Sequence, residues 1–242
     1  MRNMEDYTTR YAVPGFENYQ VKYRRKLVLE QIERYKPENI LEIGCGYEPL
    51  FKYVQGIRFT VVEPSKEFYE NARELAREAE NIFCIRGTVE DAVNELENNY
   101  DMVICSSLLH EVEKPIELLH SIEKICNDKT VVHINVPNAN SMHRLIALES
   151  GIISDTHDMS ERNKTLQQNN VFDLEKLKQL VEKTQLSVIQ GGAYFVKPFT
   201  HAQMYEMLKH DIINEEILDG LYNIGKYMPD LGSEIYVNCR KK

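Results

Sequence analysis

Two glycines flank a cysteine directly after a β-like run, at Gly44-Cys45-Gly46. Glycine has no Cβ, so a turn built from it lets the backbone approach a ligand closely. An acid, Glu63, ends the next β-like run, near the spacing from a glycine turn at which a carboxylate accepts hydrogen bonds from ribose hydroxyls. These residue types in this order predict a site for a nucleoside-bearing cofactor.

Two neighbours of the turn distinguish between cofactors. Dinucleotide-binding loops carry a third glycine, and Pro49 stands at that position here. Glu42 lies two residues before Gly44, where its carboxylate would repel a pyrophosphate but attract the ammonium group of a methionine moiety, directly or through water. S-adenosyl-L-methionine (SAM) therefore fits this loop better than NAD does.

From residue 39 to residue 136 the chain resembles the class I SAM-dependent methyltransferases, in the branch that modifies small molecules and sugars. The resemblance rests on four segments in order: Glu42-Ile-Gly-Cys-Gly46, Val61-Val-Glu-Pro-Ser65, Gly87-Thr-Val-Glu-Asp91, and the run from Tyr100 to Glu111. It implies that SAM, and its product S-adenosyl-L-homocysteine, bind at Glu42, Gly44, Cys45, Gly46, Glu63, Pro64, Thr88, Val89, Glu90 and Ser106. Within this set the resemblance gives Glu63 the ribose, and gives residues 88–90 the adenine.

The segment after the fifth β-like run is the expected acceptor region. It leaves the sheet at its carboxyl edge, where open α/β sheets bind their ligands. Asn138 and Arg144 are candidate acceptor contacts, because a helix N-terminus beside an arginine suits an anionic or hydroxyl-rich group. A plain capped helix with a surface arginine would explain the same residues without a ligand.

Methyl transfer to a hydroxyl benefits from a general base, and three histidines are candidates. His143 ranks first because it follows the fifth run on the cofactor side, His110 follows the fourth, and His157 lies in an irregular segment between Asp155 and Asp158. Each could instead be a hydrogen-bonded structural histidine. A histidine base of ordinary pKa predicts activity that falls below about pH 6.5. The cluster around His157 is too small for a metal site, so we predict no metal.

Alternating β-like and helical runs must position these residues. The β-like runs are residues 39–43, 58–63, 82–86, 100–106 and 130–136, followed by 186–195 and 234–240, and helical spacing of apolar residues marks 66–77 and 115–126. This order predicts an α/β, doubly wound, mostly parallel seven-stranded sheet of Rossmann-like type that ends in an antiparallel hairpin.

Three segments fall outside that alternation. We expect residues 1–36 to form a helical lid over the acceptor, and residues 37–242 to form the SAM-binding domain with substrate insertions at 137–170 and 197–230. The candidate acceptor contacts of the lid are Tyr11, Tyr19 and Tyr23. The alternative is that these tyrosines only pack a helix onto the domain.

Composition excludes several partners. The 29 basic and 38 acidic residues give a net charge of −9, which opposes binding to a phosphate backbone, so we expect no nucleic acid partner. No apolar leader or membrane-length run is visible, which predicts a cytoplasmic protein without a membrane partner. The 5 cysteines lack metal-binding or disulfide-framework spacing and indicate reduced thiols.

The leading functional hypothesis is therefore O-methylation of a small polar acceptor, sugar-like or phosphorylated, of the kind found in bacterial surface-glycan or capsule synthesis. One alternative is N-methylation of an amine or amino sugar. A second, of another class, is a non-catalytic SAM-binding regulatory subunit. The sequence assigns no oligomeric state.

Overall fold

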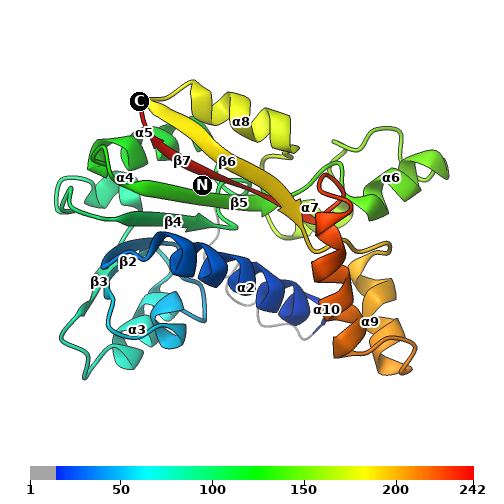
Figure 1. Cartoon of the computed structure of the whole chain (residues 1–242), viewed down its shortest axis with the longest axis horizontal. Helices are drawn as coiled ribbons and strands as arrows, with labels where there is room; N and C mark the ends of the chain where they lie inside the picture. The colour runs from blue at the N-terminus through cyan, green and yellow to red at the C-terminus, as the bar shows by residue number, and fades with distance from the viewer. Residues whose placement is uncertain (1–14) are drawn as a thin grey trace.

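The computed structural model describes residues 15–242 and contains a seven-stranded sheet in the order β3-β2-β1-β4-β5-β7-β6 (Figure 1). Strands β1 to β5 pair in parallel, whereas β7 runs antiparallel to both β5 and β6. The predicted fold class is confirmed, including the antiparallel hairpin at the end of the sheet.

The strands lie close to the apolar runs of the sequence. Their bounds are β1 (Asn39–Ile43), β2 (Arg58–Glu63), β3 (Ile82–Arg86), β4 (Met102–Ser106), β5 (Val131–Pro137), β6 (Leu186–Tyr194) and β7 (Glu234–Lys241). The first three match the prediction to the residue. Strand β4 begins later than predicted, at Met102, which is the residue that pairs with Val131 of β5.

Helices cover both faces of the sheet. Their bounds are α2 (Glu17–Tyr35), α3 (Lys66–Leu75), α4 (Val89–Ala92), α5 (Pro115–Ile125), α6 (Met142–Glu149), α7 (Glu161–Thr165), α8 (Leu174–Glu182), α9 (His201–Lys209) and α10 (Glu215–Asn223), with 3-10 turns η1 (Leu50–Tyr53) and η2 (Ile224–Lys226). Helices α4, α5 and α8 pack on one face in the largest apolar cluster, and α2 packs on the other (Figure 1).

Helix α2 is part of the core along most of its length. Val28 and Ile32 pack against strand residues of β1, β2 and β4, while Tyr23 and Leu27 pack with Phe195 and with residues of α9 and α10. Each of these α2 side chains is at most 5% exposed. One helix therefore fastens α9 and α10, which carry the second insertion, to the sheet.

Strand β7 brings a distant part of the chain to the acceptor segment, because Glu234 pairs with Pro137 at the end of β5. The turn before β7 passes very close to the end of β6. A Cβ added at Gly232 would lie 2.2 Å from the backbone nitrogen of Tyr194, so only glycine fits there. Within residues 15–242, none of the helices combines the length and apolar character that a bilayer crossing requires.

Candidate active site

The glycine turn follows β1 with both glycines in the left-handed region, at φ +73° for Gly44 and +58° for Gly46. The turn is fixed to the next strand, because Gly44 N donates to Val62 O at 2.9 Å. A Cβ added at Gly44 would lie 3.4 Å from Leu108 Cδ2. The turn after β1 therefore contacts the segment after β4, as expected for adjacent parallel strands whose carboxyl ends share one edge.

Glu63 organises this turn. Its buried carboxylate accepts hydrogen bonds from Gly46 N at 3.2 Å and from Ser65 N at 2.8 Å, and Cys45 Sγ lies 3.7 Å away. Burial raises the pKa of this carboxyl, although the two backbone donors act in the opposite direction. Each carboxylate oxygen has a second lone pair, so the carboxylate can still accept from a ribose hydroxyl.

Glu42 is buried and accepts a hydrogen bond from Leu50 N at 3.0 Å, at the start of η1. Burial raises its pKa to about 8, and the nearby charge of Glu63 acts in the same direction. Without a ligand, Glu42 is thus mostly protonated at neutral pH. A cationic ammonium beside it would favour the charged form, which is the form that the sequence prediction assigns to it.

The predicted adenine segment begins α4. Thr88 is the N-cap of this helix and accepts from Asp91 N at 3.3 Å, Val89 is buried, and Glu90 is exposed. Their adenine contacts stay a prediction, as does that of Pro64. The turn geometry at Gly44 and Gly46 and the carboxylate of Glu63 fit a SAM site.

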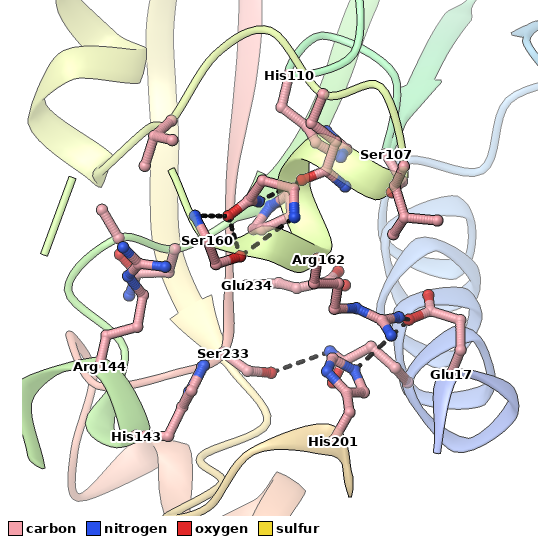
Figure 2. A pocket seen from close by; sticks show the side chains of 18 of the residues that line it. Glu17, Ser107, His110, His143, Arg144, Ser160, Arg162, His201, Ser233 and Glu234 are labelled. Atoms are coloured by element: carbon pink, nitrogen blue, oxygen red, sulfur yellow. Dashed lines mark hydrogen bonds and ion pairs between the residues drawn. The ribbon is translucent and has the colours of Figure 1, made fainter. Parts of the chain in front are cut away.

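A cavity of about 240 Å³ lies at the carboxyl ends of β4 and β5. Its walls come from the start of α2, the segments after β4 and β5, the region around α7, the segment after β6 and the start of β7, with Ser107 and His110 on the wall nearest the glycine turn. Figure 2 shows His143 and Arg144 opposite Arg162, Glu17 and His201 across this cavity. Both predicted insertions contribute to its lining.

His143 lines the cavity from α6, and its Nδ1 lies 3.0 Å from Ser141 Oγ. Burial lowers its pKa to about 3, and the neighbouring Lys197 and Arg144 act in the same direction. His143 is therefore a neutral imidazole at ordinary pH, in the state that a proton acceptor requires. His110 also lines the cavity and is buried, with Nε2 3.9 Å from Glu111 Oε1.

His157 is not among the residues that line the cavity. Its Nε2 lies 2.9 Å from Asp173 Oδ2 and its Nδ1 lies 3.3 Å from Asp155 Oδ1. Asp173 is the N-cap of α8, so His157 ties the insertion to that helix. This geometry favours the structural reading of His157. Within residues 15–242, no group of three His, Cys, Asp or Glu side chains is arranged to hold a metal ion.

Asn138 and Arg144 line the cavity, but backbone groups engage both of them. Asn138 Nδ2 donates to the carbonyls of Asp230 and Gly232, while Arg144 Nε donates to Thr156 O at 2.7 Å. Arg144 Nη2 also donates to Asp158 O at 2.6 Å, so these bonds make both residues supports of the cavity wall.

The predicted tyrosine contacts lie elsewhere. Tyr23 is fully buried, stacks on Phe195 and donates a hydrogen bond to Asp219. Tyr19 packs beside Phe16, and neither tyrosine lines the cavity. These positions favour the alternative reading, in which the tyrosines pack the helix. Tyr11 lies outside the described residues.

Sequence reasoning missed six charged or titratable cavity residues. These are Glu17, Arg24, Arg162, Lys197, His201 and Glu234. Lys197 carried a signal in the sequence, because it interrupts an apolar run after Tyr194. In the structure its side chain is 1% exposed. The others come from elements far apart in the chain, so no local motif joins them.

Sequence reasoning also missed a hydrogen-bonded network of polar groups on β4, β5 and β7. Asn135 of β5 accepts from Ser107 N and donates to Ser106 Oγ, both at 3.0 Å, and it also contacts His133 Nε2 at 3.1 Å. His133 in turn contacts Asn238 of β7 at 2.8 Å. This network holds Ser107, a non-glycine residue at φ +54°, at the rim of the cavity.

Comparison with known proteins matches residues 17–191 to the model of a family described as a methyltransferase domain. A stretch of 128 residues is 29% identical to the ubiquinone biosynthesis O-methyltransferase of Vibrio campbellii, covering 52% of this chain and 54% of the relative. The chain thus spans about half the length of the curated relatives it matches.

Solved structures share the fold. The plantazolicin methyltransferase BamL, in complex with a triazolic desmethylPZN analog and SAH, aligns with a TM-score of 0.61 at 18% identity, over 93% of this chain and 88% of that one. The [4+2]-cyclase SpnF aligns with a TM-score of 0.60 at 15% identity, over 90% of this chain and 80% of that one. These similarities show that the chain shares their fold.

Proposed function

This chain belongs to the methyltransferase domain family, and we propose that it transfers the methyl group of SAM to a hydroxyl of a small polar acceptor bound in the cavity. Supporting the oxygen as acceptor atom, the Vibrio campbellii relative is named an O-methyltransferase. The acceptor class that we propose is a sugar-like or phosphorylated metabolite, such as an intermediate of surface-glycan or capsule synthesis.

One observation carries the proposal. The cavity that holds the neutral imidazole of His143 is lined by the segment after β4, and that segment contacts the glycine turn, since Leu108, between the cavity residues Ser107 and His110, lies against Gly44. A cofactor on the turn and an acceptor in the cavity would therefore meet at the ends of β1 and β4.

Different residues of the chain would bind the cofactor, accept the proton and align the acceptor. Glu63 and the turn would bind the nucleoside and Glu42 the ammonium, while SAM supplies an activated methyl group on a sulfonium. His143 would accept the hydroxyl proton as the oxygen attacks the methyl carbon. The cavity walls would hold the acceptor oxygen in line with the sulfur and exclude water, because alignment supplies much of the rate of such a displacement.

Two measurements test the proposal. Calorimetry should show that the protein binds SAM and S-adenosylhomocysteine but not NAD, and an assay of S-adenosylhomocysteine release should identify acceptors. Glu63→Gln should weaken SAM binding by about 1–3 kcal/mol by weakening a charge-assisted acceptor. Gly44→Val should abolish binding in a folded protein, because a β-branched residue cannot adopt this φ beside Leu108.

Different outcomes would favour the alternatives. Release of S-adenosylhomocysteine only with amines would favour N-methylation of an amine or amino sugar. SAM binding without turnover on any acceptor would favour the non-catalytic subunit. Binding of NAD in place of SAM would overturn the cofactor assignment.

A further inference from the structure

The cavity lining carries an excess of positive charge. Four cationic side chains, Arg24, Arg144, Arg162 and Lys197, face two carboxylates, Glu17 and Glu234. Such an excess inside a protein of net charge −9 is a local feature that the overall composition does not explain.

Both carboxylates are engaged by arginines. Glu234 is paired with the partly buried Arg24, whose Nε donates to both carboxylate oxygens at 3.0 Å. The carboxylate of Glu17 lies 3.3 Å from Arg24 Nη2 and 2.8 Å from Arg162 Nη2. Within the described part of the chain, these pairs leave Lys197 without a carboxylate at salt-bridge distance.

Lys197 is the unusual member of this set. Its side chain is 1% exposed, and its Nζ donates at 3.3 Å to Phe199 O, which uses one of three donors. Burying an ammonium without a paired anion is costly, so a structural role alone would be served better by an apolar side chain of similar length.

Two further cavity atoms lack hydrogen bonds among residues 15–242. They are Gln20 Oε1 and His201 Nε2, both of which are buried. His201 Nε2 lies 3.5 Å from Glu17 Oε2, beside Arg162 (Figure 2). The wall that contains Lys197 thus presents polar atoms suited to a polar ligand.

We propose that Lys197 and Arg162 form an anion-binding subsite, and that the acceptor carries an anionic oxygen group, a carboxylate or a phosphate, which binds there. This inference rests on the proposed function for its link to the acceptor, but the subsite itself binds anions without any methyl transfer. Lys197 is the specificity-determining residue, because it has the unpaired charge.

An anion in this subsite would also act on His143. Burial lowers the pKa of His143 to about 3, and the charges of Lys197 and Arg144 act in the same direction, which makes it a weak base. A bound anion would offset Lys197 and Arg144 and raise that pKa toward the range in which a base is effective. Binding of an anionic methyl acceptor would thereby make His143 a stronger base.

The subsite also has a pH dependence. The groups that act on Lys197 are Arg162 of α7, Glu17 of α2 and Glu234 of β7, and the neighbouring His143 of α6 and His201 of α9 are held neutral by lowered pKa values. Burial lowers the pKa of Lys197 to about 7. Anion binding stabilises the charged ammonium, so binding near pH 8 should take up a proton and should weaken as the pH rises further.

Calorimetry with inorganic phosphate and with malonate, at constant ionic strength and in two buffers of different ionisation heat, tests the proposal. The wild-type chain should bind one anion with proton uptake, Lys197→Met should weaken binding at least about tenfold and abolish the uptake, and Arg162→Met should weaken it about fivefold. The control Lys129→Met alters an exposed lysine before β5 and should behave as wild type. Phosphate alone would identify a phosphorylated acceptor, and malonate alone a carboxylate.

Two results would overturn the subsite: no binding of either anion to the wild-type chain, or equal binding to Lys197→Met and wild type. If Lys197→Met fails to fold, the partly exposed Arg162→Met decides in the same way. Binding of S-adenosylhomocysteine, measured in parallel, separates the two proposals. A chain that binds it but not the anions loses only the subsite, and a chain that binds the anions but not the cofactor loses the proposed function.

Discussion

At the scale of single residues, the histidines separate into cavity and structural roles. His143→Ala should lower kcat by about a hundredfold or more, because it removes the proton acceptor. The matched control His157→Ala should leave kcat unchanged and lower the melting temperature, since it removes the contact with Asp173 at the start of α8. Steady-state kinetics and thermal unfolding of both variants provide the measurement. Normal turnover of His143→Ala at saturating acceptor would point to His110 or to an amine nucleophile.

The environment of His143 also corrects the expected pH profile. An ordinary histidine base predicts loss of activity below about pH 6.5. With its pKa lowered to about 3, His143 stays neutral far below that pH, so the profile of kcat/KM should show no histidine limb near 6.5. For an anionic acceptor it should instead fall above about pH 7, as Lys197 loses its proton.

Glu42 makes folding stability depend on pH. Its carboxyl has an ordinary pKa of 4.5 and a pKa of about 8 in the folded chain. Between these values the unfolded chain has lost the proton while the folded chain keeps it, so this group lowers stability as the pH rises from 4.5 to 8. In urea at pH 8, Glu42→Gln should therefore stabilise the cofactor-free protein by about 1 kcal/mol or more, and it should weaken SAM binding. The exposed control Glu33→Gln should change neither property, and equal unfolding midpoints for Glu42→Gln and wild type would contradict the assignment.

At the scale of elements, α2 tests the prediction that residues 1–36 form a lid. Because Leu27, Val28 and Ile32 are buried against the sheet and α10, amides of residues 24–34 should exchange slowly without ligands. S-adenosylhomocysteine and acceptor should add protection only at residues 17–20, where Glu17 and Gln20 line the cavity. Hydrogen exchange with and without ligands gives the answer. Ligand-dependent protection along the entire helix would support the lid prediction, of which residues 1–14 lie outside the described residues.

The elements also show what the sequence can and cannot predict. Strands β1, β2 and β3 were predicted to the residue because each is a nearly continuous apolar run with polar or turn residues beside it. The glycine turn and Glu63 were found for the same reason, since one βαβ unit holds both. The cluster of Arg24, Arg162 and Lys197 was missed because tertiary packing brings it together from α2, α7 and the segment after β6. No local sequence motif therefore indicates it.

At the scale of the whole molecule, the charge of the protein and the charge of the cavity oppose each other. The net charge of −9 repels an approaching anion, whereas Lys197 is buried and screened much less by salt. We expect kcat/KM for an anionic acceptor to rise severalfold between about 10 and 100 mM salt, and that for a neutral analogue to stay constant. Initial rates over this range provide the test. A steady fall for the anionic acceptor would show that surface cations dominate its capture.

The place of β7 in the sheet has a consequence for biosynthesis. Strands β1 to β5, with the glycine turn and Glu63, are complete when translation reaches Pro137, but β7, which begins at Glu234, must insert between β5 and β6. The nascent chain can therefore form strands β1 to β5 and the glycine turn early, while the edge of β5 stays unpaired until β7 has been synthesised. Ser233 and Glu234 close the cavity at the same moment. A ribosome-bound intermediate should thus acquire cofactor affinity before it acquires an acceptor site.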